Sequence, residues 1–140
     1  MANEITVTAA NISALTENGA VIRNYTAGAA ITVGNLVYVD SAGTVQHADG
    51  NGSLATGAAI GIAIESYDGE TSILTGGPVS VCVFGPVSGY SSMTPGSNVY
   101  VSDTVGRLSS VAGTISRIIG YAETAGIVFV HPQQNVTSSA

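Results

Sequence analysis

The sequence predicts an all-β protein with a single domain, and three observations indicate this fold class. Val, Ile, Thr and Tyr recur in short runs that are bounded by Gly, Asn, Asp, Ser or Pro, as is typical of strands. No segment shows the apolar period of a helix. The turn and strand at 32–39 (TVGNLVYV) return at 94–101 (TPGSNVYV), which favours two related halves that share one core.

The expected strands follow the apolar runs along the chain. They cover residues 5–8, 21–25, 36–39, 45–47, 59–66, 71–74, 79–84, 98–101, 108–109, 116–122 and 126–130. Asp68-Gly69 is typical of a tight hairpin, so the strands on either side of it are expected to be antiparallel neighbours. Thr94-Pro95-Gly96 has the type II turn pattern, and the first copy keeps the glycine but has Val33 at the proline position. Gly34 and Gly96 are therefore the predicted structural turn residues.

The two ends of the chain differ from its repeated body. Residues 1–20 are predicted to form an N-terminal arm, and residues 133–140 a flexible C-terminal tail. Between them lies one β domain, residues 21–132, with pseudo-repeats at about 28–87 and 90–132. The arm either folds back on its own body or adds a strand to another chain, and the residues favour neither alternative.

Charge is scarce in this chain. Charged residues make up 9% of it, against roughly 25% in ordinary soluble proteins, and 45% of the residues are hydrophobic. We therefore expect weakly polar or apolar surface that contacts other chains, rather than a surface covered by Ser and Thr. The formal net charge is -6, and the cationic side chains are Arg23, Arg107 and Arg117, so nucleic acid is not an expected partner. No apolar run approaches the roughly 20 residues that span a bilayer, so a membrane is not expected either.

The start of the chain has neither a basic region nor an apolar region typical of a secretory signal, so we expect synthesis in the cytoplasm. Cys82 has no cysteine partner within the chain and lies in an apolar run, which favours an inert core thiol. Tyr38 and Tyr100 occupy matching positions in the repeat and alternate with valines, which favours a packing role over a ligand-binding aromatic pair.

Residues that could carry chemistry are few and scattered. Neither His47 nor His131 lies in a recognisable catalytic setting, and Ser88 stands one position too late for a nucleophile elbow. The loop 49–52 (DGNG) lacks the further carboxylates of a calcium loop. No glycine pattern is typical of a phosphate-binding loop. We therefore expect no enzyme activity, no cofactor and no metal.

Three segments together resemble the capsid decoration, or cement, proteins of tailed bacteriophages. They are 25–40 (YTAGAAITVGNLVYVD), 58–63 (AAIGIA) and 93–96 (MTPG), and the resemblance covers roughly residues 20–130. It rests on glycine spacing and strand pattern. The resemblance implies a small β-clip or β-tulip-like barrel that binds the outside of an assembled head, as a homotrimer at threefold or quasi-threefold positions. This chain departs from better-charged members of the family because it has no lysine.

The resemblance also implies partners and contacts. The expected partners are the major capsid protein and further copies of the chain, and the expected location is the outer capsid surface of the virion after synthesis in the host cytoplasm. The N-terminal arm is expected to join these contacts through its apolar residues Ile5, Val7, Ile12 and Leu15. No catalytic residue is implied.

The main alternative is a virion surface adhesion or fibre module that binds host glycan or protein. Its contacts would come from the glycine-rich segments 48–57 and 85–92, in which Tyr90 is the aromatic residue. A third alternative, a small β-barrel enzyme or nucleotide sensor, requires convergent titratable groups completed by partner chains.

Overall fold

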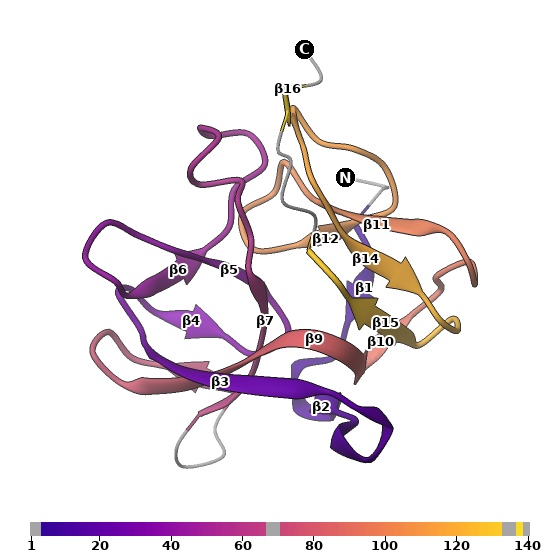
Figure 1. The fold of residues 1–140 in the computed structure, drawn as a ribbon, viewed down its shortest axis with the longest axis horizontal. Helices are drawn as coiled ribbons and strands as arrows, with labels where there is room; N and C mark the ends of the chain where they lie inside the picture. Colours follow the sequence, from indigo (N-terminus) through magenta and orange to yellow (C-terminus); the bar gives the residue numbers. More distant parts are fainter. Residues whose placement is uncertain (1–3, 67–70, 133–136, 139–140) are drawn as a thin grey trace.

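The computed structural model describes residues 4–66, 71–132 and 137–138 of the chain (Figure 1). Its regular structure is almost entirely β, which confirms the all-β prediction, with two short 3₁₀ turns, η1 (Ala9–Asn11) and η2 (Thr16–Asn18). The strands are β1 (Thr6–Val7), β2 (Ser13–Ala14), β3 (Val21–Thr26), β4 (Ile31–Thr32), β5 (Leu36–Val39), β6 (Val45–His47), β7 (Gly61–Ser66), β8 (Ser72–Ile73), β9 (Pro78–Ser88), β10 (Tyr90–Ser91), β11 (Asn98–Val101), β12 (Leu108–Ser109), β13 (Ile115–Ser116), β14 (Ile118–Ala122), β15 (Ile127–Val130) and β16 (Thr137–Ser138).

One curled antiparallel sheet dominates the fold (Figure 1). Its strand order is β12-β11-β14-β15-β9-β7-β5-β6, and β2 and β3 pair with β9 beside this path. The order has the same form from either edge, because β12-β11-β14-β15 at one end corresponds to β6-β5-β7-β9 at the other. The centre of the sheet is the antiparallel pair β9 and β15.

The turns that precede β5 and β11 have matching geometry. Gly34 and Gly96 adopt positive φ angles of 97° and 88°, the conformation that favours glycine at such a turn position. The amide of Gly34 donates to the carbonyl of Ala63 at 2.7 Å, and the amide of Gly96 donates to the carbonyl of Ala122 at 2.7 Å. Each turn is therefore attached in the same way to the strand beside it, β7 in one case and β14 in the other.

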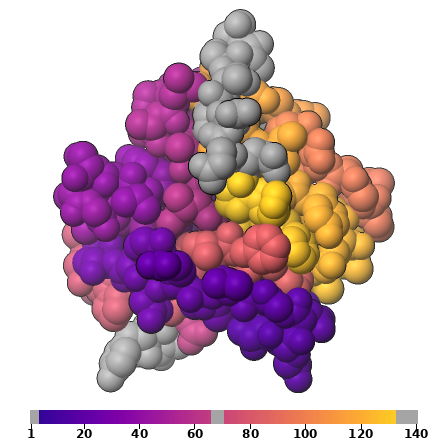
Figure 2. All heavy atoms as spheres, in the orientation of Figure 1, coloured from indigo at the N-terminus to yellow at the C-terminus, as the bar shows by residue number. Residues whose placement is uncertain are grey.

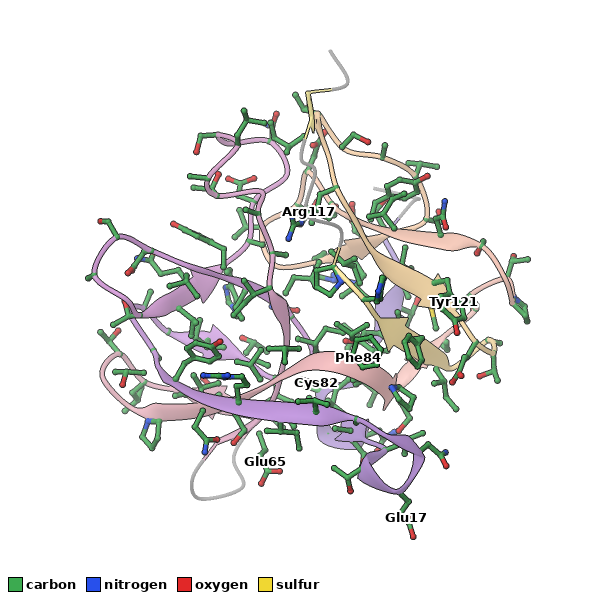
Figure 3. The ribbon with its side chains drawn as sticks, in the orientation of Figure 1. Glu17, Glu65, Cys82, Phe84, Arg117 and Tyr121 are labelled. Atoms are coloured by element: carbon green, nitrogen blue, oxygen red, sulfur yellow. The ribbon has the colours of Figure 1, made fainter. Side chains whose placement is uncertain are left out.

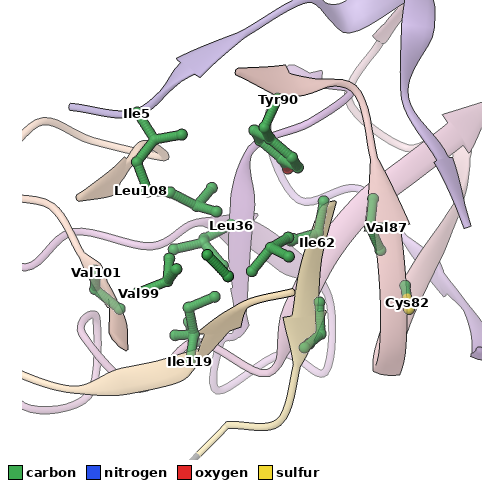
Figure 4. Close-up of a cluster of buried hydrophobic side chains, with 14 of the residues drawn as sticks. Ile5, Leu36, Ile62, Cys82, Val87, Tyr90, Val99, Val101, Leu108 and Ile119 are labelled. Carbon is green, nitrogen blue, oxygen red and sulfur yellow. The ribbon is translucent and has the colours of Figure 1, made fainter. Parts of the chain in front are cut away.

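Two hydrophobic clusters form the core. The first fills the inside of the curl and draws on both ends of the sheet, with Leu36 and Ile62 from one end and Val99 and Ile119 from the other (Figure 4). The second lies on the opposite face of β5, β7 and β9, where Val37 is fully buried with side chains from β4 and β8. As a result the first two residues of β5, Leu36 and Val37, are buried on opposite faces, and the buried residues of the second cluster include none from β11, β14 or β15.

Most predicted strands are present, and β5, β6, β11 and β12 have the predicted bounds. The strand predicted at 79–84 instead continues to Ser88, because Gly85, with a φ of 111°, redirects the strand without ending it. The strand predicted at 116–122 is divided into β13 and β14 at Arg117.

The Asp68-Gly69 hairpin lies outside the described residues, but the pairing expected around it is wrong. Within the part of the chain that the structure describes, β7 pairs with β5 and β9, whereas β8 pairs with β4. β8 instead takes β4 as its neighbour, through Ile31 opposite Ile73 and Thr32 opposite Ser72.

Both ends of the chain contact its body. In the predicted arm, residues 1–3 lie outside the described residues, β1 pairs with β10, and β2 pairs with β9. The described part of the arm thus pairs with the chain's own body, and addition of an arm strand to another chain stays a prediction. In the predicted tail, residues 133–136 and 139–140 lie outside the described residues, and β16 pairs with β13.

Candidate interaction surface

Four ring-bearing side chains gather on the outer side of the central strands, and we call this group the aromatic face. It consists of Phe84 on β9, Tyr121 on β14, Phe129 on β15 and His131 just after β15. Phe84 and Tyr121 are labelled in Figure 3. Tyr121 and Phe129 stack with ring centroids 5.3 Å apart, while Phe84 meets Phe129 edge-on at 5.1 Å and His131 at 5.6 Å. Phe84 is 42% exposed and Tyr121 40% exposed.

Strand alternation explains why these rings point outward. Val128 and Val130 are fully buried in the first core cluster, so Phe129 between them faces the other side of β15. Tyr121 precedes the buried Ala122 and lies directly opposite Phe129 in the β14–β15 register. The aromatic face is therefore the partly exposed side of the same strands whose other side forms the core.

The matching face of the other half of the sheet is covered. The segments 60–63 (IGIA) and 119–122 (IGYA) match, so Tyr121 corresponds to Ile62. Leu36 pairs with Ile62 between β5 and β7, just as Asn98 pairs with Tyr121 between β11 and β14. Leu36 and Ile62 are fully buried, whereas Asn98 and Tyr121 are exposed. Equivalent positions thus form core in one half and open aromatic surface in the other.

The aromatic face continues onto β3. Val21 lies opposite Phe84 in the β3–β9 register and is 48% exposed. The space-filling view shows β3, β9 and β15 together on this side of the molecule (Figure 2). Large exposed apolar side chains that lie together on one face are typical of surfaces that contact other proteins.

The predicted arm contacts lie against the chain's own body. Ile5 is only 7% exposed and belongs to the first core cluster, so in this conformation its side chain is unsuited to contact a partner. Val7 and Ile12 are half-buried and pack on the turn at Gly34. Leu15 is also half-buried, and its amide donates to the carbonyl of Pro86 at 2.9 Å. Contact of Val7, Ile12 and Leu15 with another chain stays a prediction.

Two of the three arginines hold parts of the fold together. Arg107 donates to the carbonyl of Ile5 at 2.8 Å and so fixes the arm. Arg117 is buried and donates to the carbonyl of Ala59 at 2.8 Å, and burial lowers the pKa of its guanidinium. Arg23, on β3, is the exposed arginine.

His47 has a structural setting. Its Nε2 accepts a hydrogen bond from the amide of Thr32 at 3.0 Å, which requires the ring nitrogen to be unprotonated. Burial lowers the pKa of His47, in the direction that favours this neutral form. Cys82 is fully buried in the first core cluster, and burial raises the pKa of its thiol. The predicted core position of Cys82 is thus confirmed.

The glycine-rich segment 85–92, which the adhesion alternative requires as a loop, is mostly strand. It comprises the end of β9 and all of β10. Tyr90, its aromatic residue, is 6% exposed, and its hydroxyl donates to the carbonyl of Gly34 at 2.7 Å. The expectation that Tyr90 could serve as an exposed aromatic platform is therefore wrong. The other segment, 48–57, does form a loop, in which Leu54 is 53% exposed.

Among residues 4–66, 71–132 and 137–138, no three His, Cys, Asp or Glu side chains lie close enough together to hold a metal ion. The same residues include no helix of the length and apolarity that a membrane span requires.

The sequence-based prediction missed the aromatic face, although part of its signal was present. Alternation along 127–130 (IVFV) places Phe129 on the opposite face of the strand from the valines on either side of it. This pattern would have predicted an outward-facing ring. The pairing of Tyr121 with Phe129 depends on the β14–β15 register, which the sequence does not specify.

In comparisons with known proteins, the sequence matches no protein-family model, and no curated protein matches it significantly.

Proposed function

We propose that the chain is a capsid decoration protein that binds the outer surface of a phage head and stabilises it by bridging neighbouring capsid subunits. Its partners are the major capsid protein and further copies of itself in a homotrimer. It acts on the outer capsid surface of the virion after synthesis in the host cytoplasm. The single observation that carries the proposal is the open aromatic face formed by Phe84, Tyr121 and Phe129.

The contrast between the two halves of the sheet supports this role. Ile62 is fully buried, and its match Tyr121 is 40% exposed, in hairpins with corresponding pairing. Contact of apolar rings with water is unfavourable. Burying them on association contributes about 25 cal/mol of free energy for each Å² of apolar surface. The aromatic face is accordingly the surface by which one copy meets another or meets the capsid.

The fold proposed for this role is a β-clip or β-tulip-like barrel made of two pseudo-repeated halves with an N-terminal arm. The matched turns at Gly34 and Gly96, with equal hydrogen bonds to Ala63 and Ala122, support the repeat. The palindromic strand order of the main sheet supports it independently.

Low charge suits the same role. A protein with 9% charged residues and a net charge of -6 has little long-range attraction for a target, so its affinity must come from close apolar and backbone contacts. On a capsid, many such contacts act together, and repetition strengthens weak individual sites.

The test compares heads that carry the protein with heads that lack it. Thermal release of DNA is followed for both, and the stripped heads are then re-supplied with wild-type protein or with Tyr121→Ser. We expect the wild-type protein to raise the midpoint of release and Tyr121→Ser to restore less of it. Equal midpoints for decorated and stripped heads would contradict the proposed function.

A further inference from the structure

Strand β3 presents an open edge. Within the described residues it pairs only with β9, through the register from Val21 opposite Phe84 to Thr26 opposite Pro78. Tyr25 is half-buried, and the other five residues of the strand are exposed. A strand of six residues with one unpaired edge presents a row of amide and carbonyl groups that can pair with a further strand.

The two terminal strands of the main path, β12 and β6, are short and covered, and β2, which among the described residues also pairs only with β9, has just two residues. β12 has two residues. The amide of Ile5 donates to the carbonyl of Leu108 at 2.9 Å, and Glu4 forms an isolated antiparallel β-bridge with Ser109. β6 has three residues, and the amide of Gly28 donates to the carbonyl of Val45 at 2.8 Å. Natural sheets protect their edges with short strands and covering segments, and β3, with six residues, is the longest edge strand of this sheet among the described residues.

We propose that β3 accepts an extended acidic segment of the major capsid protein, which adds to the sheet as an antiparallel strand. This inference rests on the proposed function and names the backbone contact that accompanies the aromatic face. Strand addition supplies affinity through main-chain hydrogen bonds, which suits a protein with little charge. Val21 lies beside Phe84, so the added strand would also border the aromatic face.

Charge complementarity selects this occupant over a second copy of the chain. Arg23 presents its guanidinium in the middle of β3, and the strand has no acidic side chain of its own. In a centred antiparallel pair of two β3 strands, Arg23 would face Asn24 of the second copy and would gain no carboxylate. An acidic side chain opposite Arg23 forms a charge-assisted hydrogen bond, the stronger kind.

The test uses hydrogen–deuterium exchange on the full-length protein, free and bound to empty expanded heads of the phage that encodes it. We expect the outward-facing amides of β3 to exchange rapidly in the free protein and at least about tenfold more slowly on heads, since a new ladder of hydrogen bonds protects them. The amides of β12 and β6, which lie at covered edges, serve as internal controls.

A matched pair of variants tests the charge. Arg23→Gln removes one positive charge from β3, and Ala55→Glu changes the net charge by the same amount in an exposed loop. We expect Arg23→Gln to weaken head binding at least about tenfold and Ala55→Glu to leave it near the wild-type value, because the lost bond is charge-assisted. Circular dichroism and the thermal midpoint establish that both variants are folded.

Each other outcome refutes a defined part of the account. Binding to heads with unchanged exchange in β3, or with equal effects of the two variants, overturns the inference and leaves the proposed function intact. Absence of head binding overturns both. Protection of β3 in the free protein that disappears on dilution identifies a second copy as the occupant and also overturns the inference.

Discussion

Gly34→Ala and Gly96→Ala are matched substitutions that separate the cost of a turn from the cost of displacing the arm. Both glycines have positive φ, 97° and 88°, and a left-handed conformation costs a residue with a side chain roughly 1–2 kcal/mol. A Cβ at Gly34 would lie 2.8 Å from Cγ2 of Val7 and 3.1 Å from Cγ1 of Ile12. A Cβ at Gly96 would have no atom within 4 Å.

The expected losses of stability therefore differ. Gly96→Ala should lower the free energy of unfolding by about 1–2 kcal/mol, the conformational cost alone. Gly34→Ala adds an overpacking cost of about 1–3 kcal/mol against the arm, so its total loss should be about 2–5 kcal/mol. Urea unfolding, followed by circular dichroism, measures both values for the same chain.

The arm's contribution is isolated by repeating both substitutions in a Val7→Ala background, which removes the nearest methyl group. We expect the cost of Gly34→Ala to fall in that background, with a coupling of about 0.5–3 kcal/mol. Gly96→Ala and Val7→Ala should add within about 0.5 kcal/mol, because nothing connects them. Equal losses for the two glycines, or no coupling between positions 7 and 34, would refute the packing of the arm on the first turn.

Three further predictions concern single side chains. Tyr121→Ser should reduce self-association in sedimentation velocity. It should lower the free energy of unfolding by only about 0.5–1.5 kcal/mol, the value of one aromatic pair. Unchanged self-association would contradict the role of the aromatic face as a contact surface. Tyr90→Phe removes the hydroxyl that donates to the buried carbonyl of Gly34 and should cost about 1–3 kcal/mol in urea unfolding, so a neutral result would contradict that bond. The pKa of folded His47 lies below its ordinary value of 6.5, so the unfolded chain takes up the proton first. The contribution of His47 to stability is thus complete above that pH and is lost as the pH falls through the folded pKa. The urea midpoint should drop as the pH is lowered below about 6.5, and His47→Gln, which keeps an acceptor for Thr32, should flatten the drop.

Local signals were enough to predict much of the fold. A positive-φ glycine followed by an alternating apolar run defined β5 and β11, and their bounds agree with the sequence pattern. The strands that were missed, such as β2 and β4, have two residues each and depend on partners distant in the sequence. Pairing rather than composition forms such strands, so they leave no run to recognise.

The candidate surfaces depended on information that the sequence does not carry. Gly85-Pro86 is typical of the end of a strand, yet β9 continues through it to Ser88. The segment 85–92, predicted as a loop, is therefore mostly strand. The open edge of β3 follows from the lack of a second neighbour among the described residues, and the aromatic face follows from the register of β14 and β15. Register and neighbours are properties of the folded sheet, so neither surface could be predicted from periodicity alone.

Co-sedimentation of the protein with empty heads, prepared before and after expansion, tests the proposed function most directly. The wild-type protein should pellet with expanded heads and reach saturation as its concentration rises, because a surface lattice offers a fixed number of equivalent sites. Protein that stays in the supernatant with both kinds of head, at every concentration, would contradict the role in capsid decoration.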